Sequence, residues 1–277
     1  MPQAGGDTME VKDFRRSARE AVRGKWKLAL PLFLLAALLL QKFGVAQLRA
    51  ALAPHVTLDP QLDVQEILLL PTWVSAVLLA LELALGVAAG WIRIGMYGVS
   101  IELLEGRTPT LRTLFPGKRL GAGLLMGVLL TAVNRGTTLL AQLMQRMEGF
   151  PGVFLLIIAA LAVAGLVVWI LIRLDMTYYL LARRPGMRLT AALGESFRRM
   201  RGNVSRAIRL TLSLMGWCLL SVVAQNLLLR AAALLPGIAR VAAQLAIAVA
   251  LNAPLQVYIL TSFAALYRWV EAAGGDD

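Results

Sequence analysis

The chain has 277 residues, of which 58% are hydrophobic and only 16% are charged, and its mean hydropathy is +0.70. Soluble domains average about 45–50% apolar and about 25% charged residues, so this composition excludes an ordinary soluble domain. The apolar residues come in long, nearly uncharged runs, as they do in membrane-spanning helices. No linker or polar block interrupts them, and we predict a single integral membrane domain over residues 1–277.

The net charge of the chain is +12. In a soluble protein such a charge would indicate nucleic-acid binding. Here the basic residues flank the apolar runs and form no basic face outside them, so we expect no nucleic acid as a partner. The pattern favours orientation by the positive-inside rule and attraction to membrane lipids with anionic headgroups.

The sequence offers few residues for metal binding or thiol chemistry. Cys218 is the only cysteine, lies within an apolar run and is interpreted as a small buried hydrophobe. His55 is the only histidine. One histidine and one cysteine make no metal cluster unless carboxylates supply the other ligands, so we expect no metal and no cofactor.

A basic amphipathic helix is predicted over residues 8–24. Val11, Phe14 and Ala18 share one face of this helix, while its arginines share the other. Such a helix is suited to lie on a membrane surface, although an ordinary solvated charged helix would show a similar pattern.

A second short basic helix is predicted over residues 190–201. Its apolar residues again share one face, and Arg198, Arg199 and Arg201 point elsewhere. These three arginines are the candidate contacts for a lipid or a protein partner on the cytoplasmic side.

Six apolar runs are each long enough for the roughly 20 residues that cross a bilayer. The predicted spans cover residues 28–48, 72–104, 120–147, 153–182, 204–234 and 238–270. A signal peptide would also place basic residues before the first run, but a long leader and a poor cleavage context favour an uncleaved span. The predicted fold class is therefore all-α, a six-transmembrane-helix bundle with two basic surface helices.

Glycines four residues apart occur in two of the spans, at Gly86 and Gly90 and at Gly123 and Gly127. Small residues at this spacing let two helix backbones approach closely. We predict helix packing at these positions, either within one chain or between chains.

The distribution of basic residues predicts the topology. With the amino terminus in the cytoplasm and six crossings, both termini are cytoplasmic and only six of the 28 Lys and Arg residues lie on the outer side. The opposite orientation would invert this ratio, against the positive-inside rule. The six residues are Lys42, Arg49, Arg135, Arg146, Arg230 and Arg240.

Four segments carry a family resemblance, and they are RSAREAVRGKWKL at Arg16–Leu28, EGRTPTLRTLFP at Glu105–Pro116, RRMRGN and LSLMGW within Arg183–Trp217, and Pro254–Tyr267. In this order they resemble a family of bacterial multi-pass membrane proteins catalogued as domain of unknown function 975. The chain departs from the family's pattern at residues 182–185 and 169–174. The resemblance implies a bacterial cell membrane as the location and brings no established activity with it.

The sequence contains no recognisable catalytic set. His55 stands alone in a predicted outer loop, and no phosphate-binding loop or HExxH motif is present. We therefore expect a protein that is not an enzyme, and a lipid-handling enzyme without a known motif is the weakest alternative.

Polar residues within the spans are the other candidates. Glu82 lies about 11 residues into the second span, roughly 16 Å deep, so it must be protonated, hydrogen-bonded or paired, with Arg135 as the nearest candidate cation. Asn252 lies near the carbonyl of Ala250, which Pro254 is expected to free. These residues could form an ion or substrate site, or they could simply hold helices together.

Two functions follow from these observations. The leading one is a non-enzymatic membrane organiser, regulator or accessory subunit that binds a protein partner or anionic lipid through the basic helices. The alternative is a small transporter or permease subunit that uses the carboxylate of Glu82 within the membrane.

Overall fold

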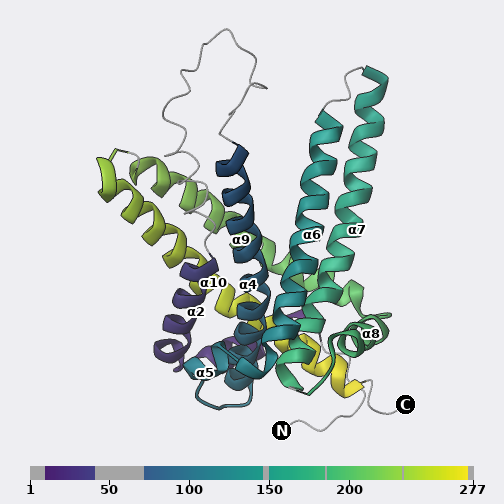
Figure 1. The fold of residues 1–277 in the computed structure, drawn as a ribbon. Helices are drawn as coiled ribbons and strands as arrows, with labels where there is room; N and C mark the ends of the chain where they lie inside the picture. Colours follow the sequence, from purple (N-terminus) through teal and green to yellow (C-terminus); the bar gives the residue numbers. More distant parts are fainter. Residues whose placement is uncertain (1–9, 41–71, 146–149, 185, 233, 274–277) are drawn as a thin grey trace.

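The structure, a computed structural model, describes residues 10–40, 72–145, 150–184, 186–232 and 234–273. Throughout these ranges the chain forms helices, turns and short connections, and no strand (Figure 1). The all-α prediction is confirmed for this part of the chain.

Ten helical elements follow one another in the described ranges. They are α1 (Val11–Val22), α2 (Trp26–Leu40), α4 (Thr72–Leu104), α5 (Leu111–Leu114), a 3-10 turn (Gly117–Arg119), α6 (Leu120–Gln145), α7 (Phe150–Arg183), α8 (Leu189–Arg199), α9 (Val204–Ala232) and α10 (Gly237–Ala273). Five of them, α4, α6, α7, α9 and α10, occupy the same stretches as five predicted spans. Only the first part of the predicted span 28–48 lies within the described residues, as α2.

Three helices in the described part of the chain are long and apolar enough to cross a membrane. Their qualifying stretches are Leu83–Leu104 of α4, Val204–Ala232 of α9 and Ala242–Ala273 of α10. Trp26–Leu39 and Leu120–Val133 are apolar but shorter. Many of the apolar residues of the chain therefore lie in long apolar helices.

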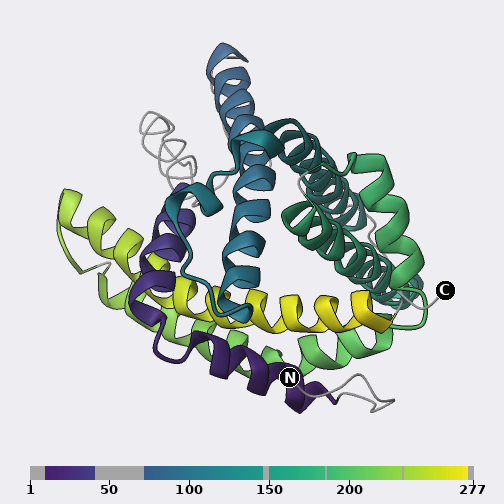
Figure 2. The same cartoon turned by 90° about the horizontal axis from the view of Figure 1, so that it is seen from below.

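Most buried side chains gather at one end of the molecule, which we call the base. It consists of α1, α5 and α8 together with residues 92–104 of α4, 172–183 of α7 and 253–273 of α10. From the base, α6 and α7 extend on one side of α4 and the pair α9 and α10 on the other (Figures 1 and 2). Buried residues make up 61% of the apolar window in α4 but only 17% of that in α9.

The apolar face of α1 is covered by protein. Phe14, Ala18 and Val22 are almost fully buried, and the Phe14 ring packs edge to face on Trp269 of α10 at 6.1 Å. A membrane is therefore not what this face contacts. Since the apolar face is used for docking, α1 presents only its basic face outward.

The glycines of α4 and α6 bring these helices into backbone contact, as the sequence predicted. A Cβ atom at Gly90 would lie 2.3 Å from the backbone N of Gly127, and one at Gly127 would lie 2.2 Å from the carbonyl O of Val87. Both positions face backbone, which cannot rotate away as a side chain can. The close approach occurs within one chain and fixes the register of α4 against α6.

This contact predicts that Gly127→Ala destabilises the protein. Overpacking a close contact costs about 1–3 kcal/mol, and we expect the midpoint of thermal unfolding in detergent to fall. Gly121→Ala is the matched control on the same helix, because a Cβ atom there meets nothing within 4 Å. Equal stability of the two variants would contradict the packing argument.

Candidate functional site

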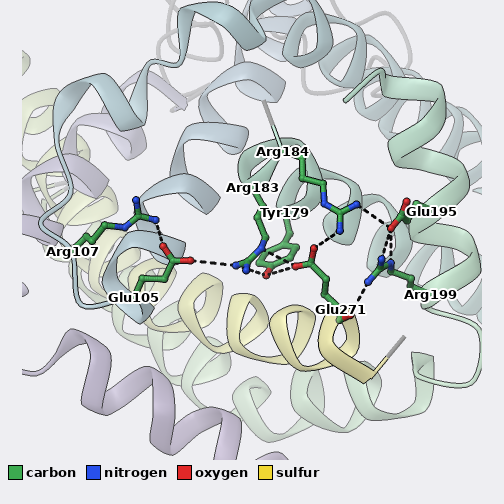
Figure 3. A network of polar contacts seen from close by, with 8 residues as sticks. All are labelled: Glu105, Arg107, Tyr179, Arg183, Arg184, Glu195, Arg199 and Glu271. Carbon is green, nitrogen blue, oxygen red and sulfur yellow. Dashed lines mark hydrogen bonds and ion pairs between the residues drawn. The ribbon is translucent and has the colours of Figure 1, made fainter. Parts of the chain in front are cut away.

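Glu271, in the last turn of α10, is the centre of an ionic network at the base (Figure 3). Its carboxylate lies 3.0 Å from Arg183 Nε and 2.7 Å from Arg184 Nη2, and the Tyr179 hydroxyl donates a hydrogen bond to it at 3.2 Å. Its backbone carbonyl accepts a hydrogen bond from Arg199 Nη1 at 2.9 Å. Only 13% of the Glu271 side chain is exposed, so salt and water screen these contacts weakly.

Two more glutamates extend the network to both sides. Arg183 Nη1 lies 3.3 Å from the carboxylate of Glu105, just after α4. Arg184 Nη1 lies 3.4 Å from Glu195 of α8, and Arg199 Nε donates to the same carboxylate at 2.7 Å. The eight members shown in Figure 3 are Glu105, Arg107, Tyr179, Arg183, Arg184, Glu195, Arg199 and Glu271.

The local sequence explains why the network branches. Arg183 is the last residue of α7, and Arg184 follows it with its backbone N–H still bonded to the Leu180 carbonyl at 2.8 Å. Consecutive side chains on a helical turn point about 100° apart. One guanidinium can therefore face α4 while the other faces α8, with Glu271 between them. The network ties together the ends of α4, α7, α8 and α10.

A layer of buried tyrosines lies next to this network. Tyr97 of α4 stacks on Tyr178 of α7 with ring centroids 6.5 Å apart, and Tyr267 of α10 packs on both Tyr97 and Tyr179 at 6.2 and 5.8 Å. The Tyr267 hydroxyl donates to the backbone carbonyl of Ile172 at 3.4 Å. These rings join α4, α7 and α10 into one aromatic core.

An ion pair joins α4 to α7 on the same faces as the tyrosines. Arg93 Nη2 lies 2.8 Å from Asp175 Oδ1, and the Arg93 guanidinium carbon lies 5.5 Å from the centre of the Tyr178 ring. The Arg93 Nε is buried and makes no hydrogen bond to a described residue. The pair satisfies the charge of each partner, which is its minimum requirement in an apolar setting.

The predicted intramembrane residues are placed only in part. Glu82 belongs to α4 and Arg135 to α6, but their side chains lie outside the described part of the structure. Gly86 faces Thr131 across this antiparallel pair. Glu82 lies four residues before Gly86 and Arg135 four residues after Thr131, so in this antiparallel pair the two positions lie at the same level.

Asn252 is bonded within its own helix. Its side-chain amide donates to the backbone carbonyl of Ala248 at 2.8 Å, and α10 continues through Pro254. The Asn252 amide therefore bonds to the carbonyl of Ala248 and not to that of Ala250, which Pro254 was expected to free.

The three predicted contact arginines are separated by the structure. Arg198 and Arg201 are exposed and make no ion pair with a described residue. Arg199 is only 11% exposed and binds Glu195 and the Glu271 carbonyl. Arg199 thus holds the base together, while Arg198 and Arg201 face outward.

Glu271 is the main residue that sequence reasoning missed. The last predicted span, 238–270, ends one residue before it, whereas Glu271 lies in α10 and accepts bonds from three arginines. A usable signal was its spacing of four residues after Tyr267, which puts both on one helical face. Among the described residues, no group of three or more His, Cys, Asp and Glu side chains could hold a metal ion.

The network predicts that Glu271→Gln destabilises the base. Partly buried hydrogen bonds to charged groups contribute about 1.5–3 kcal/mol, and two arginines would lose their main carboxylate. We expect a lower unfolding midpoint in detergent and faster hydrogen exchange in α8. The control is Glu20→Gln, whose carboxylate contacts only the exposed Arg16 and should matter little. Similar effects of both variants would contradict the role of Glu271.

Comparison with known proteins gives one match. A family model described as "Protein of unknown function (DUF975)" matches residues 123–273, which is more than half of the chain. No curated protein and no solved structure matches. The matched stretch begins in α6 and includes the whole of α7 to α10, and therefore Glu195 and Glu271.

Proposed function

We propose that this chain, which belongs to the family of proteins of unknown function DUF975, gathers anionic lipid at the cytoplasmic face of a bacterial cell membrane. It would act as a multi-pass organiser or accessory subunit and not as an enzyme. Three helices that are long and apolar enough to cross a membrane support the membrane location. The exposed, unpaired arginines of the base carry the lipid proposal.

Six spans would result if α2, α4, α6, α7, α9 and α10 all crossed the bilayer. The last five are 26 to 37 residues long, more than the roughly 20 that are needed. The described part of α2 has 15 residues, so its crossing requires residues beyond Leu40. The arginines at the base favour a cytoplasmic base by the positive-inside rule.

Part of the outward positive charge of the base is uncompensated because three of its glutamates bind arginines of the network. Glu105, Glu195 and Glu271 all bind arginines of the network. Exposed arginines that form no ion pair within the described ranges include Arg19, Arg23, Arg112, Arg188, Arg198 and Arg201. A surface of this kind attracts anions electrostatically.

A lipid surface fits this charge better than a single partner. The arginines come from α1, α5 and α8, which are spread around the base (Figure 2). The apolar face of α1 is already buried, so the attraction would be electrostatic without insertion. Each basic residue near an anionic membrane surface contributes about 1 kcal/mol.

This proposal predicts that the double variant Arg19→Gln, Arg198→Gln loses preference for anionic lipid. The preference of phosphatidylglycerol over phosphatidylcholine should fall several-fold, since each charge is worth about 1 kcal/mol before screening by salt. Quenching of tryptophan fluorescence by brominated lipids in reconstituted vesicles measures the preference directly.

The matched control removes the same charge from the other end of the molecule. Arg230 and Arg240 are exposed near the turn between α9 and α10, and Arg230→Gln, Arg240→Gln should leave the preference unchanged. An unchanged preference in the first variant would contradict the proposal. If Arg19→Gln, Arg198→Gln keeps its lipid preference but loses a protein that co-purifies with wild type at fixed stoichiometry, a protein partner would be favoured.

One observation favours the transporter alternative. The register fixed by the glycines of α4 and α6 puts Glu82 and Arg135 at the same level on adjacent helices. Ionisable residues at the same level within neighbouring spans often mark a proton or ion pathway. The same pairing would also serve helix packing.

The alternative predicts a proton flux that depends on Glu82. In pyranine-loaded proteoliposomes with an imposed pH gradient, Glu82→Gln should abolish the flux because the amide cannot exchange a proton. Thermal unfolding should be unchanged, and Gln142→Ala in α6 is a control within the same helix pair. Equal proton fluxes for wild type and Glu82→Gln would rule out this use of Glu82.

A further inference from the structure

Arg173 of α7 is held by aromatic rings and has no acidic partner among the residues that the structure describes. Its guanidinium carbon lies 3.8 Å from the centre of the Trp169 ring and 4.7 Å from that of Phe197 in α8. The two rings meet edge to face at 6.1 Å and so enclose the guanidinium on two sides. Stacking fixes the position of the group but leaves its five N–H donors unused.

The guanidinium of Arg173 makes no hydrogen bond to a described residue. Its Nε is buried and has no partner among the described residues, and no described carboxylate forms an ion pair with it. Arg93 of the neighbouring helix differs, because Asp175 neutralises it at 2.8 Å. A guanidinium that is fixed, partly desolvated and unpaired is ready to bind an anion.

A second arginine follows the ring that covers Arg173. Arg201 is exposed just beyond α8, four residues after Phe197, so it lies about one helical turn from the ring that stacks on the Arg173 guanidinium. The positive charges of Arg201 and Arg173 repel each other. Packing holds them there, since Ser196 of α8 donates to the Arg173 carbonyl and Phe197 stacks on the Arg173 side chain. An anion between the two groups would convert this repulsion into two attractions.

The pair lies where the exposed apolar surface of α7 ends. Leu166 and Trp169, just before Arg173 in the helix, are 55% and 38% exposed. Beyond Arg173, residues 176–182 are buried in the base. An exposed tryptophan between an apolar surface and a charged group is typical of the headgroup level of a membrane.

We propose that Arg173 and Arg201 form a discrete site for the phosphate of one anionic phospholipid, with its acyl chains along the exposed surface of α7 at Leu166 and Trp169. Guanidinium groups suit this ligand because they bind phosphate oxygens through paired N–H donors. The adjoining apolar surface selects a lipid phosphate over free phosphate. The site rests on the proposed lipid function and adds to it a fixed place and a stoichiometry of one.

Native mass spectrometry of the full-length protein, released from nanodiscs of phosphatidylglycerol and phosphatidylcholine, tests the site. Wild type should retain one phosphatidylglycerol per chain. Arg201→Gln, which changes an exposed side chain without disturbing the core, should lower the retained fraction by about tenfold, which corresponds to about 1.4 kcal/mol. Arg173→Lys keeps the charge but loses the paired donors, so it should retain an intermediate fraction.

Arg188→Gln is the matched control, since Arg188 is also exposed beside α8 but is not part of the pair. It should retain the lipid as wild type does. Retention of the lipid in both Arg201→Gln and Arg173→Lys would overturn the site. Displacement of the lipid by millimolar inorganic phosphate, with equal stabilisation of the protein, would overturn the assignment to a lipid.

The outcomes for the site and for the general function can be told apart. If Arg201→Gln keeps its bound lipid while Arg19→Gln, Arg198→Gln loses its lipid preference, the discrete site is wrong and the basic surface stands. If neither substitution changes any lipid measurement, both proposals fail.

Discussion

The carboxylate of Glu271 is the constraint on which the base of this protein depends. It neutralises Arg183 and Arg184 at the end of α7, while its backbone carbonyl holds Arg199 of α8. The carboxylate is largely shielded from water. Its loss would therefore leave arginines without a partner at a place where water cannot solvate them well. Glu195 and Glu271 thereby face inward, while arginines such as Arg198 and Arg201 face outward. The basic surface on which the proposed lipid binding depends is therefore a consequence of how the ion pairs are arranged inside.

The base and the diverging helices differ in what stabilises them. At the base, aromatic and aliphatic side chains bury one another, as Tyr97, Tyr178 and Tyr267 do. Along α9, large apolar residues such as Leu219 and Leu227 remain 60% and 62% exposed. Lipid hydrocarbon would cover such residues in a bilayer, where no hydrophobic driving force favours burial against protein. The proposed lipid site lies at the boundary between these two regimes.

The sequence was most informative about features that a local residue pattern is enough to predict. The glycines at the spacing of Gly123 and Gly127 indicated a close helix contact, because only small residues allow it, and the structure identified α4 as the partner. The short helices α1 and α8 were also predictable, since helical periodicity is local. What covers the apolar face of α1 was not, because the surface formed by α4, α9 and α10 exists only after folding. Arg199 was grouped with its neighbours for the same reason, as its partner Glu271 lies 72 positions away in the chain.

The sequence by itself determined that the chain is basic, rich in apolar runs and helical throughout the part that the structure describes, because hydropathy and helical periodicity depend on residues a few positions apart. Only the tertiary structure decided which charges are neutralised and which remain available. Arg93 has Asp175, Arg183 has Glu271, and Arg173 has aromatic rings in place of a carboxylate. The physical reason is that ion pairing depends on distance in space, and the partners come from helices separated by tens of residues along the chain.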